Sequence, residues 1–119
     1  MPFRIVDVDG EPLRIVIEGE FGYQDILDAF KALRREGLSD RPRRLWDVRG
    51  ATPHLTSEEL RNLGWEGQTH DRVPSRLAIL VDQDFHFGLA RAHEAFRESE
   101  LAEVKVFRDE EEALVWLRG

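Results

Sequence analysis

The sequence contains no cysteine, so disulfide bonds, thiolate nucleophiles and cysteine–zinc sites are excluded. It also has no long hydrophobic run, because no apolar stretch approaches the roughly 20 residues that a membrane-spanning helix needs. The first twelve residues carry no apolar core preceded by positive charge, and we therefore expect no signal peptide. These absences predict a cytoplasmic protein that does not insert stably into a membrane.

The signatures of common catalytic and nucleotide-binding sites are missing as well. The sequence has no G-x-S-x-G, GxGxxG or P-loop motif. The histidines lack the spacing of metal ligands, since His86 and His93 lie two helical turns, or about 10 Å, apart on one predicted helix. We therefore expect no catalytic residue, no cofactor and no metal site, and predict that the protein is not an enzyme.

Positive charge is in short supply. The chain has 17 lysines and arginines against 24 aspartates and glutamates, which gives a formal net charge of −7. A nucleic-acid duplex requires a basic surface, so this balance argues against a nucleic-acid partner. The length of 119 residues and the 41% hydrophobic content suit one folded core, and we expect a single domain over residues 1–119.

The most informative stretch present is the unbroken apolar run Leu-Ala-Ile-Leu-Val at residues 77–81. Such a run is typical of a strand that is buried on both faces of a sheet. A helical period follows over about residues 84–97, with Phe85 and Leu89 on its buried stripe. Because strand and helix patterns alternate along the rest of the chain, we predict a mostly parallel sheet with right-handed crossovers.

The other elements are placed by turn and capping residues. Asp9-Gly10 predicts a hairpin and therefore an antiparallel first strand, and Gly37 suits the end of a helix. Thr56 and Glu59 form a capping box at a helix start, and Asp109 and Glu112 repeat it. The remaining strands are expected near residues 3–8, 13–18, 45–48 and 104–107, with a helix at 23–36, further helices after the two caps, and loops at 19–22, 39–44 and 50–55. The predicted class is α/β, with a five-stranded sheet in the order β-β-α-β-α-β-α-β-α.

A first candidate site lies at the carboxyl ends of the strands, where ligands gather in open α/β sheets. Asp47 and Arg49 close the third predicted strand, and Thr56 and Ser57 begin the next helix. Arg49 beside the free amides of that helix start would form a weak site for a small anion or a regulatory site. The alternative is that Asp47 and Arg49 pair with each other or with the backbone. Arg41, Arg43 and Arg44 are expected to form only a solvated loop.

A second candidate site is a pocket or an interface formed by residues that fit the buried stripes poorly. Phe85 and Phe87 cannot both face the core, and Arg91 lies on another side of the helix from Leu89. The alternative is a wide apolar face on a well-buried helix. The candidate residues are Trp65, Asp84, Phe85, His86, Phe87 and Arg91.

Three segments carry a family resemblance. They are FGLARAHEAFRE at residues 87–98, VFRDEEEALVWL at residues 106–117, and Trp46-Asp47-Val48-Arg49 followed by a capped helix. With the order of elements, they resemble the bacterial STAS/SEC14 domain family, also called SpoIIAA-like. The resemblance implies the fold of anti-sigma-factor antagonists, which is shared in part with lipid-carrying CRAL-TRIO domains.

The resemblance also implies a function. It favours a non-catalytic regulatory or binding module that contacts a protein partner, a second copy of the chain, or a small anionic or apolar ligand. The alternative is a SEC14-like carrier of lipids or other apolar ligands, and a third is an enzyme of unknown reaction.

One motif of the family is absent. Anti-sigma-factor antagonists carry an Asp-Ser-Ser-Gly-like segment after the third strand, where a kinase phosphorylates a serine. Here residues 54–59 read His-Leu-Thr-Ser-Glu-Glu, so the resemblance does not carry that switch to this chain. If any residue is phosphorylated, Ser57 at the helix start is the best candidate, although Glu58 and Glu59 would repel the added negative charge.

Overall fold

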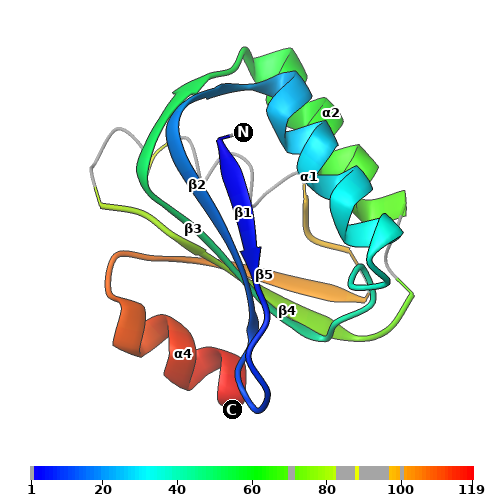
Figure 1. Ribbon diagram of the computed structural model, residues 1–119, viewed down its shortest axis with the longest axis vertical. Coiled ribbons are helices and arrows are strands. Elements are labelled where there is room, and N and C mark those ends of the chain that lie inside the picture. Colours follow the sequence, from blue (N-terminus) through cyan, green and yellow to red (C-terminus); the bar gives the residue numbers. More distant parts are fainter. Residues whose placement is uncertain (1, 70–71, 83–87, 89–96, 100) are drawn as a thin grey trace.

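A computed structural model describes residues 2–69, 72–82, 88, 97–99 and 101–119 of the chain (Figure 1). The elements are β1 (Phe3–Val6), β2 (Leu13–Gly22), α1 (Tyr23–Arg35), β3 (Arg43–His54), α2 (Ser57–Thr69), β4 (Ser75–Leu80), β5 (Ala102–Phe107) and α4 (Glu110–Arg118). The helix predicted near residues 84–97 lies almost wholly outside the described residues.

The strands form one five-stranded sheet in the order β1-β2-β3-β4-β5. β1 is antiparallel to β2, and every other neighbouring pair is parallel. The predicted α/β class, strand number and antiparallel first strand are therefore confirmed. Gly10 has a φ of 81° in the turn between β1 and β2, a conformation that glycine adopts without strain.

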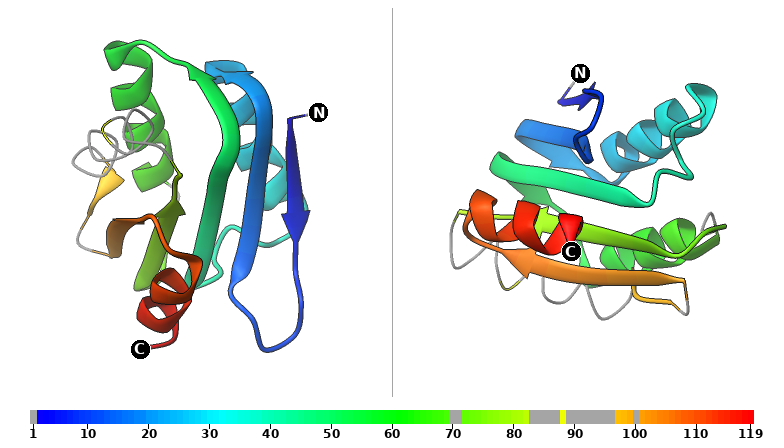
Figure 2. Two further views of the ribbon diagram at one scale, coloured as in Figure 1. Left: turned by 90° about the vertical axis from the view of Figure 1, so that its left-hand side faces the viewer. Right: turned by 90° about the horizontal axis from the view of Figure 1, so that it is seen from below.

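Helices cover both faces of the sheet. α1 and α2 lie side by side on one face, and α4 lies on the other (Figures 1 and 2). On the first face, the buried side chains of Leu13, Ile15 and Ile17 in β2 pack into one cluster with α1. On the second face, Leu45, Ala78 and Leu80 pack with Leu117 of α4. The sheet thus separates two apolar clusters.

β2 and β3 are longer than the sequence predicted. Residues 19–22 and 50–54, expected as loops, continue the parallel pairing from Gly19 opposite Ala51 to Gly22 opposite His54. Most of these residues, above all the three glycines and Pro53, are poor strand formers. The pairing satisfies their backbone groups, and it buries Phe21 and Ala51. Tertiary pairing therefore overrides local propensity, and the two loop predictions were wrong.

β3 contains a bulge where this long pairing shifts register. Asp47 lies opposite Val16, but Gly50 lies opposite Glu18, so β3 has one residue more than β2 between these pairs. An extra residue reverses the side-chain alternation that follows it. Trp46 and Ala51, an odd number of residues apart, consequently both belong to the cluster on the α1 side.

The helix starts follow the predicted caps, but α2 runs further than predicted. The Thr56 hydroxyl accepts a hydrogen bond from the Glu59 amide at 3.1 Å, and the Glu59 carboxylate accepts one from the Thr56 amide at 2.9 Å. From the sequence we would expect this helix to fray near residues 64–67, where two glycines occur, but that expectation is wrong, because the helix continues to Thr69. A Cβ at buried Gly67 would collide with Arg97, so glycine there permits close packing.

The apolar run at residues 77–81 forms most of β4, with pairing on both sides and Leu77, Ala78 and Leu80 buried. The prediction of a buried parallel strand is confirmed. β4 is the fourth strand of the sheet, however, and the middle position belongs to β3.

The capping box of α2 gives the first prediction. We expect Thr56→Ala to lower the free energy of unfolding by about 1 kcal/mol, because the Glu59 amide loses its acceptor. Thr56→Ser retains that acceptor and is the matched control, with a nearly unchanged value. Urea denaturation of the three proteins measures the difference, and equal midpoints for wild type and Thr56→Ala would contradict this assignment of the cap.

Candidate functional site

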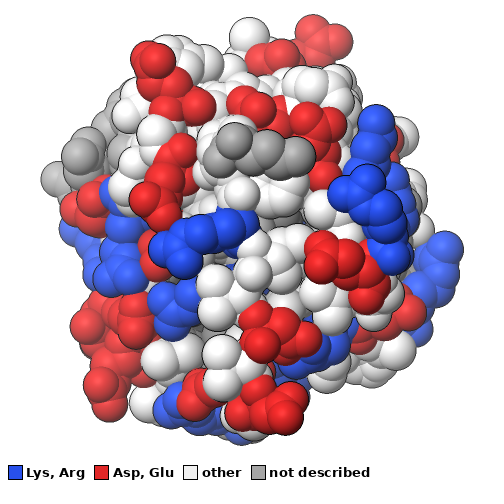
Figure 3. Space-filling view, in the orientation of Figure 1, with Lys and Arg blue, Asp and Glu red and all other residues white. Residues whose placement is uncertain are grey.

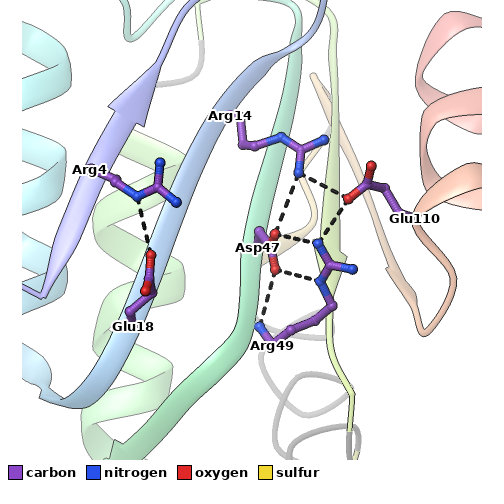
Figure 4. Close-up of polar contacts among 6 residues, drawn as sticks. All are labelled: Arg4, Arg14, Glu18, Asp47, Arg49 and Glu110. Atoms are coloured by element: carbon purple, nitrogen blue, oxygen red, sulfur yellow. Dashed lines mark hydrogen bonds and ion pairs between the residues drawn. The ribbon is translucent and has the colours of Figure 1, made fainter.

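Asp47 and Arg49 belong to a four-residue ion network on the α4 side of the sheet (Figure 4). Asp47 accepts hydrogen bonds from Arg49 Nε at 2.9 Å and Nη2 at 2.8 Å, and Arg14 Nη1 of β2 lies 3.5 Å from its Oδ2. Glu110, the first residue of α4, accepts from Arg49 at 2.8 Å and from Arg14 at 3.1 Å. Two arginines and two carboxylates thus compensate one another and tie α4 to β2 and β3.

The network changes the ionisation of its carboxyl groups. Burial of the Asp47 carboxyl opposes its ionisation, but hydrogen bonds from Arg49 and the charges of Arg49 and Arg14 outweigh burial, so the pKa of Asp47 is lowered. The hydrogen bond from Arg14 is the main reason why the pKa of Glu110 is also lowered, with burial opposing it and Arg49 assisting. The hydrogen bond to Asp47 raises the pKa of Arg49. All these groups are charged at neutral pH.

The structure does not bring Arg49 to the start of α2. β3 continues to His54, so Arg49 lies five residues before the strand ends, about 17 Å along it. Its side chain also contacts α4, whereas Thr56 and Ser57 begin the helix on the opposite face. The pairing of Asp47 with Arg49, which the sequence left as the alternative, is what the structure contains.

Of the second candidate site, only Trp65 lies in the described part of the chain. Trp65 is on α2, and 69% of its surface is exposed. Asp84, Phe85, His86, Phe87 and Arg91 lie outside the described residues. The sequence prediction for this site therefore stays a prediction.

An apolar pocket that the sequence did not predict lies between the sheet and the pair α1 and α2. Its cavity volume is about 130 Å³. The described residues that line it are Phe21, Ile26, Phe30, Leu33, Arg34, Ser39, Arg44, Trp46, Val48, Ala51, Pro53, Leu55, Leu60, Leu63, Gly67, Leu77, Ile79, Arg97 and Val104. Most of these side chains are aliphatic or aromatic, so the pocket suits an apolar group.

Among the described residues of this lining, the charged ones are arginines. Arg34, Arg44 and Arg97 line the pocket, and the described lining residues include no aspartate or glutamate. Arg44 and Arg97 are only 8% and 4% exposed. Arg44 donates to the Ser75 hydroxyl at 3.3 Å. All three arginines also interact with other groups of the chain.

Arg44 corrects the prediction that residues 39–44 form a solvated loop. The strand β3 begins at Arg43, and the alternation Arg44, Trp46, Val48 directs all three side chains toward the pocket. This alternation could have indicated that the strand starts before residue 45. The cluster of arginines at residues 41–44 instead favoured a solvated loop. The helical spacing of Leu60 and Leu63 predicts that both face inward, and both are buried. No local pattern indicates that space remains beside them.

No group of three metal-binding side chains occurs among the described residues, and no described helix is long and apolar enough to cross a membrane. On the face seen in Figure 3, acidic and basic side chains are interspersed.

Comparisons with known proteins connect this architecture to a fold. No family model and no curated protein matches the chain. Among solved structures, an uncharacterized protein of the DUF3478 family with a SpoIIAA-like fold, from Shewanella loihica PV-4, matches with a TM-score of 0.62. The match covers 97% of this chain and 91% of that protein at 18% sequence identity. The chain has a SpoIIAA-like fold.

The SpoIIAA-like fold confirms the fold that the three sequence segments implied. At 18% identity, the likeness carries the arrangement of strands and helices and does not carry a binding partner or an activity. The pocket and the ion network are therefore the features of this chain that bear on its function.

The ion network gives the second prediction. At pH 7, we expect Asp47→Asn to lower the free energy of unfolding by about 1–3 kcal/mol, because the buried carboxylate loses charge-assisted hydrogen bonds from Arg49. The folded-state pKa of Asp47 is lowered, so its stabilising effect is complete above the unfolded pKa and is lost as pH falls through the folded pKa. The difference in free energy of unfolding between wild type and Asp47→Asn should therefore shrink as the pH falls below about 4.

Glu18→Gln is the matched control for this measurement. Glu18 pairs with Arg4 at 3.2 Å on the same face of the sheet, but both side chains are more than half exposed. We expect this variant to differ from wild type by less than about 0.5 kcal/mol. Denaturant titrations between pH 3 and pH 7 measure the free energy of unfolding of wild type and both variants. If the difference between wild type and Asp47→Asn stays constant across that range, the electrostatic explanation is wrong.

Proposed function

We propose that the protein is a non-catalytic, STAS-type binding module that holds a small apolar group in the pocket between α1, α2 and the sheet. The observation that carries this proposal is the cavity of about 130 Å³ with its largely apolar lining. Side chains around an empty cavity lose dispersion contacts, and an apolar ligand restores them without competing for hydrogen bonds. An apolar group is therefore the occupant that this pocket favours.

The cavity volume limits the size of the ligand. A cavity of about 150 Å³ in another protein binds benzene, so this pocket matches one aromatic ring or a short aliphatic chain. Pockets for drug-sized ligands usually measure about 300–1,000 Å³. The second candidate function is a SEC14-like carrier of whole lipids. The apolar lining favours this function, but a cavity of about 130 Å³ is too small for a whole lipid.

The ion network supports the non-catalytic part of the proposal. A general base works best when its pKa lies near the operating pH. The pKa of Asp47 is lowered instead, and its carboxylate is occupied by hydrogen bonds from Arg49. Such a group stabilises structure and has little capacity to accept a proton at neutral pH. A cytoplasmic location and contact with a protein partner or a second copy remain predictions.

Toluene is the probe that tests the proposal. We expect saturating toluene to raise the melting temperature of the protein, because a ligand that binds only the folded state stabilises it by mass action. In Ala51→Leu the larger side chain occupies part of the cavity, since Ala51 is buried and lines it. The toluene-dependent shift should therefore be lost in this variant, measured against its own melting temperature without ligand.

Val115→Leu is the matched control, because it enlarges an aliphatic side chain at an exposed position on α4, away from the pocket. This variant should retain the full shift with toluene. If toluene shifts neither wild type nor control, or shifts Ala51→Leu by the same amount, the pocket is not a ligand site and the proposal fails.

A further inference from the structure

We infer that the ligand of this pocket carries an aromatic ring, and that Phe30 and Trp46 select this ring over an aliphatic group of the same size. The inference rests on the proposed function, which leaves open whether the apolar group is a ring or a short chain. It narrows the ligand to one chemical class and assigns the selection to two side chains.

The two aromatic side chains reach the pocket from different layers of the fold. Phe30 belongs to α1 and Trp46 to β3, and both line the pocket. Their ring centroids are 5.8 Å apart and their planes cross at 86°, which is an edge-to-face contact. Aromatic rings prefer this arrangement because the positive edge of one ring meets the negative face of the other. The pocket wall therefore contains the interaction by which a further ring would be recognised.

The wall beside Trp46 is a continuous aliphatic surface on the sheet. The register of the strands places Ile79 of β4 opposite Trp46, and it places Leu77 of β4 opposite Val104 of β5. All four side chains line the pocket, so they share one face of three neighbouring strands. Because neighbouring strands lie only about 4.8 Å apart, a planar ring can lie on this surface and present its edge to the aromatic pair.

Both aromatic rings keep accessible surface, although they lie inside the fold. Trp46 is in the middle strand of the sheet, on the face that α1 and α2 cover, yet it is only partly buried. Its neighbour Leu45, which faces α4, is 1% exposed. Phe30 on α1 is partly buried as well. The cavity accounts for this difference, because it borders both rings and leaves part of their surface open to a ligand.

A second aromatic pair offers a comparison within the same chain. Phe107 and Trp116 lie on the α4 side, with ring centroids 5.5 Å apart. Cations lie over both rings, since Arg76 is 5.4 Å from the ring centroid of Trp116 and Lys105 is 5.4 Å from that of Phe107. Packing of α4 against the sheet explains this pair fully. Packing alone does not explain why Phe30 and Trp46 border a cavity.

The experiment compares benzene with cyclopentane, an aliphatic ring of similar size, by NMR titration of the wild-type protein in sealed tubes. The two compounds differ in how readily they leave water, so each dissociation constant is corrected for the compound's measured partition between hexadecane and water. After this correction, we expect the protein to prefer benzene by about twofold to tenfold, which is the range that one aromatic pair contributes beyond burial.

Phe30→Leu tests which side chains cause the preference. This variant removes one ring of the pair and keeps the position apolar, so the corrected preference for benzene should fall at least about twofold. Phe107→Leu is the matched control, because it makes the same change in the aromatic pair on the α4 side. The control should retain the wild-type preference.

The outcomes separate this inference from the proposed function. If both compounds bind and the corrected preference is absent or favours cyclopentane, the aromatic inference is wrong and the apolar pocket remains. If benzene, cyclopentane and toluene all fail to bind, the proposed function is wrong as well. A preference for benzene that Phe30→Leu retains in full would place the ring away from the aromatic pair and overturn the inference. The wild-type comparison does not depend on the folding of any variant.

Discussion

The pairing of β3 between β2 and β4 is the constraint on which both faces of the molecule depend. Its side chains alternate between the faces, so Trp46 and Val48 contact the α1 side while Asp47 and Arg49 face α4. The bulge opposite β2 then restores Ala51 to the α1 side. Without that extra residue, the second half of β3 would direct its apolar side chains toward the charged face.

The two faces consequently have different physical characters. On the α4 face, Arg14 and Arg49 are matched by Asp47 and Glu110, and the charges serve to attach α4 to the sheet. On the α1 face, the packing leaves a cavity with a largely apolar lining. Compensated charge favours a structural role for the first face, whereas the apolar cavity favours a binding role for the second.

Much of the fold could be predicted from local sequence, and the candidate site could not. The apolar run of β4 and the cap at Thr56 depend on neighbouring residues alone, so their patterns were sufficient. The full length of β3 depends on its pairing with β2, which no local pattern records, and Arg49 was therefore placed too close to the start of α2. The burial of Arg44 depends on the same extension. A cavity is a property of packing between distant segments, and it requires the structure.

The most direct test of this account is to locate a bound ligand on the protein. Isotope-filtered NMR of the toluene complex measures which methyl groups lie near the aromatic ring. The account predicts contacts with the methyls of Ala51 and Leu63, which line the pocket on the α1 face. Contacts confined to Val8 and Leu114, which line a hollow on the α4 face, would contradict it.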